Sequence, residues 1–302
     1  MPYILTDDEI ELYVKAWGPE DGKPVVLIHG WPLSADTWDD LANKLADNGY
    51  RAIAYDRRGF GRSDQPDSGY DYDTLASDLD AVLDEYGNDH QATLVGFSMG
   101  GGEVVRYLAR HGTDRISHAA LISSIIPYML KTADNPDGVD QSVFDGITEG
   151  ILADRMGFLQ DFAKNFYNVG FIDKNVSQGV LDQFFNLGSQ AGLRGTLGCA
   201  KAFSSTDFRQ DCASVSVPTL IIHGTGDKVV PIDTSARQAA RLIPQAELIE
   251  LDGAPHGTLA TNKDEIAAHL LKFLAGESRS AIGGGEADVA DYQQTATLNP
   301  TL

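Results

Sequence analysis

The sequence predicts an α/β fold, with a mostly parallel, twisted sheet flanked by helices. Three observations support this prediction. Short apolar runs alternate with stretches of helical periodicity along most of the chain, and several runs are apolar almost without interruption. Between Pro127 and Pro218 the alternation gives way to helical spacing alone. Nearly continuous apolar strands are typical of parallel sheets covered on both faces, because neither face of such a strand meets water.

Seven apolar runs predict the strands. In chain order they are residues 13–17, 24–30, 51–56, 92–98, 118–124, 218–224 and 246–252. Amphipathic stretches at residues 36–47, 73–86, 103–111 and 264–274 predict helices. This alternation of strands and helices indicates right-handed crossover connections, which place the helices over the faces of the sheet.

The segment at about 127–217 predicts a helical cap insertion packed over the edge of the sheet. Its apolar residues recur at helical spacing, with no strand signal between them: Val143, Ile147 and Ile151, then Phe158, Phe162 and Phe166. A row of phenylalanines at this spacing is more often part of a core than the wall of a binding site. The alternative, a pocket wall, requires the catalytic groups to lie beneath the insertion.

Length and composition indicate one large domain with an insertion. We expect a domain at residues 1–275 and a flexible tail at 276–302, where Gly, Ser, Ala and Thr are frequent and no periodicity is present. The net charge of −21 argues against nucleic acids and anionic membranes as partners. The start of the chain shows no signal peptide, and no apolar run is long enough to span a membrane. We therefore expect a cytoplasmic protein.

The cysteines and histidines give no indication of a metal. Two cysteines, Cys199 and Cys212, make neither a disulfide framework nor a metal site, and we expect both to be reduced packing residues. No cluster of His, Cys and Asp has the spacing of metal ligands.

The strongest chemical signal is ATLVGFSMGGGEVV, where a strand runs into Gly96, Ser98 and Gly100 and a helical pattern follows at once. Glycines at these spacings permit a sharp strand-to-helix turn that exposes a serine hydroxyl above the sheet. The helix N-terminus also directs backbone N–H groups toward the same place. A serine N-cap with incidental glycines is the alternative. Because the strand–turn–helix context is met, we predict that Ser98 is a nucleophile.

A serine nucleophile needs a general base and a group that orients the base. In a fold of this kind the acid and then the histidine follow the serine in the chain, each after a later strand. PTLIIHGTGDKVVP supplies Asp227, and AELIELDGAPHG supplies His256. Asp252 is the runner-up acid, but it precedes His256 by only four residues, too few for an independent loop to present it to the ring. The other six histidines lie in contexts that favour structural roles.

An oxyanion hole requires two N–H donors directed at the developing negative charge. Met99, directly after the nucleophile, supplies one. The other is expected in the loop HGWPLS after an early strand, and since Pro32 has no N–H, the donor there is Trp31.

Together, HGWPLSADTW, YDRRGFGRSD, GYDYDT, GFSMGGGE, HGTGDKVVP and APHG resemble the α/β-hydrolase superfamily. More narrowly, they resemble its cofactor-free bacterial haloperoxidases, perhydrolases and aryl esterases. The resemblance covers roughly residues 1–274 and implies the α/β-hydrolase fold. It also implies a triad of Ser98, Asp227 and His256, with the N–H groups of Trp31 and Met99 as the oxyanion hole. One departure is Thr258, where relatives often carry phenylalanine, and the tail is another.

The resemblance further implies an enzyme without haem, metal or flavin that assembles as a trimer or a pair of trimers. The implied activity is hydrolysis of small, uncharged carboxylic esters, with hydrogen peroxide as a second acyl acceptor. Proline at the position of Pro32 accompanies perhydrolysis in that family. The carbonyl of the constrained Trp31–Pro32 peptide can accept a hydrogen bond from one O–H of hydrogen peroxide while the other peroxide oxygen attacks. The alternative is that Pro32 only stiffens a turn.

The resemblance also indicates the walls of the pocket. The residues expected there, besides Pro32, are Ile125, Met129, Phe162, Phe166 and Val229. They follow a predicted strand, belong to the phenylalanine face of the insertion, or neighbour Asp227 in the sequence. Such an apolar wall favours small hydrophobic substrates.

Two other functions stay open at this stage. One triad also serves the hydrolysis of lactones, amides or carbon–carbon bonds, and fold alone does not choose among these reactions. The second alternative is a non-catalytic protein that keeps the pocket to bind a ligand. Haloalkane dehalogenases and epoxide hydrolases are disfavoured, because they need aspartate where Ser98 stands.

Overall fold

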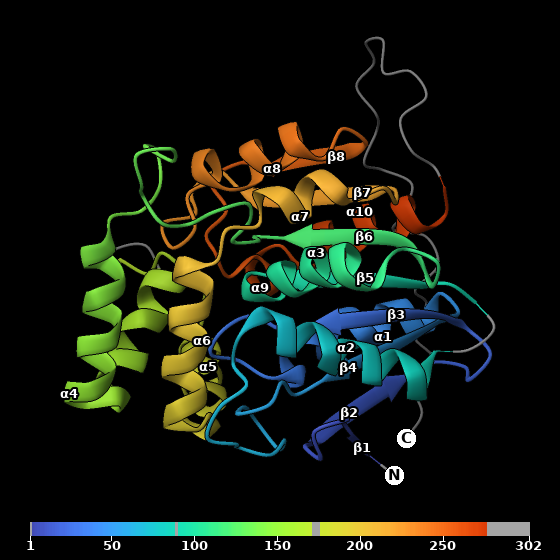
Figure 1. The fold of residues 1–302 in the computed structure, drawn as a ribbon, viewed down its shortest axis with the longest axis horizontal. Coiled ribbons are helices and arrows are strands. Elements are labelled where there is room, and N and C mark those ends of the chain that lie inside the picture. The colour runs from blue at the N-terminus through green and yellow to red at the C-terminus, as the bar shows by residue number, and fades with distance from the viewer. Residues whose placement is uncertain (1, 88–89, 171–175, 277–302) are drawn as a thin grey trace, which may run out of the picture.

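A mixed β-sheet forms the centre of the molecule in the computed structural model, which describes residues 2–87, 90–170 and 176–276 (Figure 1). Within these residues the sheet has eight strands, in the order β1-β2-β4-β3-β5-β6-β7-β8. The strands are β1 (Tyr3–Leu5), β2 (Glu11–Trp17), β3 (Lys23–Ile28), β4 (Tyr50–Tyr55), β5 (Ala92–Phe97), β6 (Ile116–Ile122), β7 (Thr219–Gly224) and β8 (Ala246–Leu251). β1 and β2 pair antiparallel, as do β2 and β4, and the pairs from β4 to β8 are parallel.

The seven strands expected from the sequence are present. The sequence did not predict β1. This strand is three residues long and buries only Ile4, so it contains no repeating pattern of apolar residues. β5 and β7 are buried at every position, in keeping with central strands covered on both faces.

Helices cover both faces of the sheet, and each face has its own hydrophobic core. One core joins the sheet to α2 (Tyr72–Tyr86), α3 (Met99–His111), α7 (Arg209–Ser214) and α8 (Ala236–Leu242). The other joins it to α1 (Asp39–Asp47) and α10 (Lys263–Leu274). Alternate residues of β3 enter the two cores: Val25 and Leu27 face one, Val26 and Ile28 the other. The short α9 (Thr258–Thr261) and two 3₁₀ turns, Ala35–Trp38 and Ile232–Thr234, lie in the connections.

Three helices form a cap at one end of the sheet, seen together in Figure 1: α4 (Gln141–Phe166), α5 (Gln178–Gln190) and α6 (Leu193–Ser205). α4 is bent at Asp154, whose backbone leaves the helical region (φ −155°, ψ 89°) and whose carboxylate accepts a hydrogen bond from the N–H of Gly157 at 3.0 Å. Asp154 thus caps the second half of the helix.

The tail expected at residues 276–302 lies outside the described residues except for Gly276. No helix in the described ranges is both long enough and apolar enough to cross a membrane.

Candidate active site

Ser98 occupies a sharp turn between β5 and α3. Its backbone has a positive φ (φ 53°, ψ −116°), which a non-glycine residue rarely adopts. The turn depends on the neighbouring glycines, because a Cβ at Gly96 would lie 2.5 Å from the Gly100 carbonyl oxygen, and one at Gly100 would lie 2.3 Å from that of Ile28. The sequence therefore holds the hydroxyl of Ser98 at the carboxyl end of β5, at the N-terminus of α3.

The three residues predicted as a triad lie in one hydrogen-bonded chain. His256 Nε2 is 2.9 Å from Ser98 Oγ, and His256 Nδ1 is 2.6 Å from Asp227 Oδ2. Because a carboxylate only accepts hydrogen bonds, the proton of the neutral ring is on Nδ1, and Nε2 is free to accept the proton of the serine. This geometry is that of a nucleophile, a general base and an orienting acid.

Asp227 is fixed by four hydrogen-bond donors. Its Oδ1 accepts from the backbone N–H groups of Val229 at 2.9 Å and Val230 at 2.7 Å. Its Oδ2 accepts from His256 and lies 3.2 Å from Nε2 of the fully buried His223. Burial by itself raises the pKa of Asp227, but the charge of His256 and hydrogen bonds from both histidines outweigh burial and hold it well below the usual value. Asp227 is therefore ionised whenever His256 acts as a base.

The loop after β3 approaches the nucleophile closely. A Cβ at Gly30 would lie 2.8 Å from the ring of Phe97 and 3.0 Å from Ser98 Cβ, so only glycine permits the approach. Trp31 follows, with its indole N–H bonded to the Thr196 carbonyl oxygen of α6 at 3.0 Å. The Trp31–Pro32 peptide bond is cis. Met99, the first residue of α3, is fully buried.

A buried ion pair connects this loop to the nucleophile helix. Arg57 Nε lies 2.6 Å from Glu103 Oε1, and Tyr55 donates to Glu103 Oε2 at 2.9 Å. Arg57 also donates from its guanidinium to the carbonyl oxygen of His29 at 2.6 Å and from its backbone N–H to the ring of His29 at 3.0 Å. Burial raises the pKa of Glu103 to about 6, although Arg57 opposes this shift. The pair therefore joins the ends of β3 and β4 to α3 behind Ser98.

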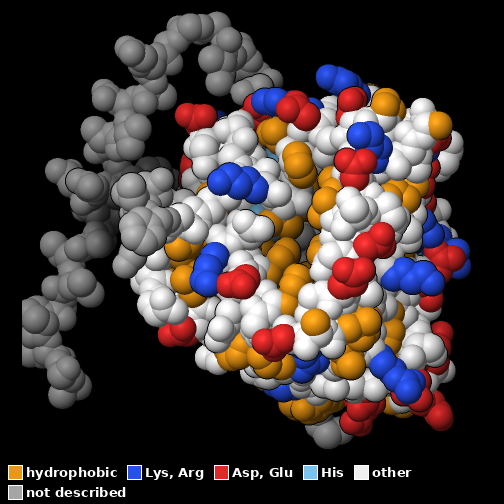
Figure 2. Space-filling view, turned by 90° about the vertical axis from the view of Figure 1, so that its left-hand side faces the viewer, with side chains coloured by type: hydrophobic (Ala, Val, Ile, Leu, Met, Phe, Trp, Pro, Cys, Tyr) orange, Lys and Arg blue, Asp and Glu red, His pale blue; other side chains and the backbone are white. Residues whose placement is uncertain are grey.

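A cavity of about 250 Å³ opens onto Ser98 and His256. It is lined by Trp31, Ser98, Ile125, Met129, Val139, Val143, Phe144, Gly146, Ile147, Phe158, Phe162, Asn165, Phe203, Lys228, Val229, Val230 and His256. Figure 2 views the cap side of the molecule and shows a hollow with hydrophobic side chains gathered in it. The cavity is thus bounded by strand-end loops on one side and by α4 and α6 on the other.

Four of the residues expected in the pocket wall line this cavity: Ile125, Met129, Phe162 and Val229. The two others, Pro32 and Phe166, do not. The ring of Pro32 instead lies against α5, where its Cγ would be 3.3 Å from a Cβ at Gly188.

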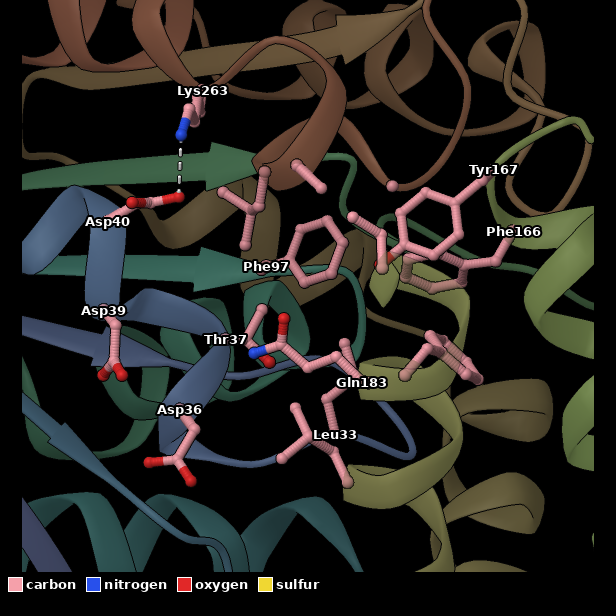
Figure 3. A pocket seen from close by; sticks show the side chains of 16 residues that line it. Leu33, Asp36, Thr37, Asp39, Asp40, Phe97, Phe166, Tyr167, Gln183 and Lys263 are labelled. Carbon is pink, nitrogen blue, oxygen red and sulfur yellow. Dashed lines mark hydrogen bonds and ion pairs between the residues drawn. The ribbon is translucent and has the colours of Figure 1, made fainter. Parts of the chain in front are cut away.

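Phe166 packs against His256 outside this cavity, with its ring centroid 4.7 Å from that of His256 and 4.9 Å from that of Phe184. There it lines a second cavity of about 360 Å³ together with Phe97, Tyr167 and Gln183 (Figure 3). The reason is helical geometry. Each step of four residues turns the side-chain direction by about 40°, so Phe166 points about 80° away from Phe158. The first two phenylalanines of the row line the catalytic cavity, and the third packs behind it.

Thr258, which departs from the pattern of the relatives, lies outside both cavities. Its buried hydroxyl is 3.0 Å from the hydroxyl of Ser123.

Several residues of the cavity lining have no signal in the sequence that links them to the site. Val139, Phe144 and Phe203 are distant in the sequence from every catalytic motif, and only the folding of the cap brings them together. Lys228 and Val230 carried a usable signal, because they adjoin Asp227 and Val229 on the same turn. Among the described residues, no group of three or more His, Cys, Asp or Glu side chains is arranged so as to hold a metal ion.

Comparison with known proteins places the chain in a family. Residues 23–263 of the chain match the sequence model of a protein family described as the alpha/beta hydrolase fold. The chain is 43% identical over 276 residues to the non-heme chloroperoxidase CPO-A1 of Kitasatospora aureofaciens, covering 91% of this chain and 99% of that protein. It is 39% identical over 275 residues to the bifunctional esterase/perhydrolase DCH of Acinetobacter calcoaceticus, with coverage of 91% and 99%.

A solved structure of a similar protein supports the same family assignment. The bromoperoxidase from Bacillus anthracis superposes with a TM-score of 0.86 at 42% identity and covers 90% of this chain and 99% of that chain. The chain therefore belongs to the α/β-hydrolase superfamily and, within it, to the family of the non-heme haloperoxidases and esterase/perhydrolases.

Proposed function

We propose that the protein is a serine hydrolase that cleaves small carboxylic esters through an acyl-enzyme and also transfers the acyl group to hydrogen peroxide. The observation that carries this proposal is the chain Ser98–His256–Asp227, whose nucleophile opens into a cavity with mainly apolar walls. An apolar wall excludes bulk water from the acyl-enzyme and selects small hydrophobic groups.

Acylation uses the triad in its resting protonation state. Ser98 Oγ attacks the ester carbonyl while its proton moves to His256 Nε2. Asp227 stabilises the imidazolium that forms. The N–H groups of Trp31 and Met99 donate to the oxyanion, each worth about 2.7–4 kcal/mol in enzymes of this kind. The proton on Nε2 then passes to the leaving alcohol, and Ser98 carries the acyl group.

Deacylation repeats these steps with a small acceptor. Water or hydrogen peroxide attacks the acyl carbonyl, its proton moves to His256, and that proton returns to Ser98 Oγ as the product leaves. Water gives the carboxylic acid, and hydrogen peroxide gives the peracid. Pro32 favours hydrogen peroxide by fixing the Trp31 carbonyl so that it accepts a hydrogen bond from the second O–H, whose proton stays on the peracid.

The sequence resemblance supports two further parts of the proposal. The enzyme needs no cofactor, and it assembles as a homo-oligomer (a trimer or a pair of trimers). A cytoplasmic location is proposed as well. Residues 1–275 form the hydrolase domain with its cap at about 127–217.

A panel of aryl and alkyl esters, assayed with and without hydrogen peroxide, tests the proposal. We expect turnover of phenyl acetate and, with peroxide present, formation of peracetic acid. The Pro32→Leu variant is expected to lower the ratio of perhydrolysis to hydrolysis several-fold while ester hydrolysis persists. An unchanged ratio would mean that Pro32 is only a turn residue, and no turnover of any ester by the wild type would refute the hydrolase itself.

A further inference from the structure

The described lining of the cavity above Ser98 contains one Lys, Arg, Asp or Glu side chain. That group is Lys228, whose neighbours in the lining are almost all apolar. Most lysines in the described part of the chain form ion pairs; Lys15, Lys44 and Lys263, for example, each contact an aspartate. Lys228 has no carboxylate within ion-pair distance among the described residues. Its exposed ammonium is therefore available to a bound molecule.

The backbone of Lys228 is held by the triad itself. Asp227 precedes it, and the N–H groups of Val229 and Val230, which follow it, both donate to Asp227 Oδ1. These hydrogen bonds fix the backbone of Lys228 relative to Asp227 and His256. The lining also includes Asn165, an exposed residue at the C-terminal end of α4, whose side-chain amide is a further polar group. An ammonium and an amide N–H both donate hydrogen bonds, and a carboxylate accepts from both.

We propose that Lys228, with Asn165, binds a free carboxylate on the substrate, so that half-esters of short dicarboxylic acids are preferred over neutral esters of the same shape. The proposal rests on the proposed function, because it concerns substrates of the same serine. The ester group lies at Ser98, the methylene chain lies along the apolar walls, and the distal carboxylate lies at Lys228.

Size and charge both bear on this preference. A cavity of about 250 Å³ has the volume of roughly eight water molecules, enough for an acyl chain of a few carbons. The net charge of −21 lowers the concentration of anions near the protein, and a cation at the cavity offsets this effect locally for an anionic ester. Lys228 is placed to do so at the cavity. Without it, the same net charge disfavours the half-ester.

The test compares monoethyl glutarate with ethyl 5-oxohexanoate. In the second compound a methyl ketone replaces the carboxylate, so shape is conserved and charge is lost. The wild type is expected to hydrolyse the half-ester with the higher kcat/KM, through a lower KM, and added salt is expected to reduce the difference. We compare the kcat/KM for the half-ester with the kcat/KM for the ketone ester and take the ratio of the two values. Lys228→Met is expected to lower this ratio roughly fivefold, and Lys228→Glu is expected to lower it further. Lys228→Arg is expected to retain the wild-type ratio.

Lys272→Met is the matched control. Lys272 is an exposed lysine of α10 outside both cavities, so this variant changes the net charge equally and is expected to keep the wild-type ratio. Turnover of the ketone ester by every variant shows that the hydrolase is intact. If the ketone ester is hydrolysed but the ratio does not respond to Lys228→Met, Lys228 is only a solvated surface charge and the proposal is wrong. If neither ester is hydrolysed by the wild type, the proposed function fails instead.

Discussion

Asp227 receives more hydrogen bonds than a triad acid needs in order to orient one imidazole. One of its partners is His223, which the sequence had favoured as a structural histidine. The Nε2–H of His223 lies between Asp227 Oδ2 at 3.2 Å and the Val230 carbonyl oxygen at 2.8 Å. Its Nδ1 is buried without a hydrogen-bond partner among the described residues. We therefore assign His223 a positioning role, acting on the base through the acid.

This role predicts a specific pattern for two substitutions of His223. His223→Leu removes the donor and is expected to lower kcat about tenfold with little change in KM, since a hydrogen bond to a charged group is worth about 1.5–3 kcal/mol. His223→Gln places an amide N–H near the position of Nε2 and is expected to recover most of the loss. Steady-state kinetics on phenyl acetate measure both effects. Equal activity of the two variants would mean that His223 only fills space.

The proximity of Ser98, His256 and Asp227 could be predicted from the sequence because each of these residues has a local signature. Ser98 has its glycines and the strand–turn–helix pattern, and Asp227 and His256 each follow an apolar strand. The role of His223 could not be predicted in the same way. It lies four residues before Asp227, and only the path of the intervening Gly-Thr-Gly turn brings its ring to the carboxylate.

At the scale of elements, α3 packs so closely against β3 that one added methyl group is expected to disturb the contact. A Cβ at Gly100 would lie 2.3 Å from the carbonyl oxygen of Ile28, which belongs to a central strand and cannot move away cheaply. Gly100→Ala is expected to lower the free energy of unfolding by about 2 kcal/mol and to reduce activity by displacing Ser98. Urea unfolding and ester hydrolysis measure the two effects.

Gly179→Ala is the control, because Gly179 is also helical but a Cβ there meets only Ser177 Oγ at 3.7 Å. This variant is expected to be as stable as the wild type or up to about 1 kcal/mol more stable, from helix propensity alone. A similar response of the two glycines would contradict the steric argument.

An ion-pair cluster fixes the β1–β2 hairpin to α2. Arg58 is buried between Asp78 of α2 and Asp8 of the hairpin, and it donates to Asp8 at 2.7 and 2.8 Å. The hydrogen bonds from Arg58 lower the pKa of Asp8 to about 2. Because the folded-state pKa lies below the ordinary value of 3.8, the stabilisation is complete above about pH 4 and is lost as the pH falls toward 2.

Asp8→Asn tests this linkage. The side chain of Asp8 is 54% exposed, so we expect a loss of less than 1 kcal/mol at pH 7. The difference from the wild type should shrink between pH 4 and pH 2.5, as measured by urea unfolding. Asp7→Asn removes a neighbouring exposed carboxylate and is the control. A difference that persists unchanged at pH 2.5 would exclude the Arg58 pair as its source.

At the scale of the whole molecule, the alternation of strands and helices predicts the sheet and its helical layers, because each strand must be buried and each helix must cover a face. The walls of the cavity could be predicted only in part. Phe162 and Phe166 carry the same helical signal, yet the turn of α4 directs one to the catalytic cavity and the other behind His256. Such differences depend on how the helix packs in three dimensions, and the spacing of apolar residues in the sequence does not determine this packing.

Leu274 is the last residue of α10, which is the last helix among the described residues. α10 packs through Ile266 and Leu270 into the core on the α1 side of the sheet. A chain that ends at Ala275 is therefore expected to keep its melting temperature, its assembly state and its esterase activity. Thermal unfolding and size-exclusion chromatography with light scattering provide the measurement. A large fall in melting temperature or loss of the oligomer would show that residues 276–302 pack against the body or against a neighbouring subunit.

Covalent labelling tests whether Ser98 is a nucleophile activated by His256. The protein is treated with a serine-directed phosphonate, and the intact mass and the modified peptide are determined by mass spectrometry. We expect one adduct per chain, located on Ser98, and no adduct on the Ser98→Ala variant. Labelling of His256→Ala is expected to be strongly slowed, because the serine then lacks its base. No adduct on the wild type, or an adduct on another residue that persists in Ser98→Ala, would show that Ser98 is not the activated nucleophile.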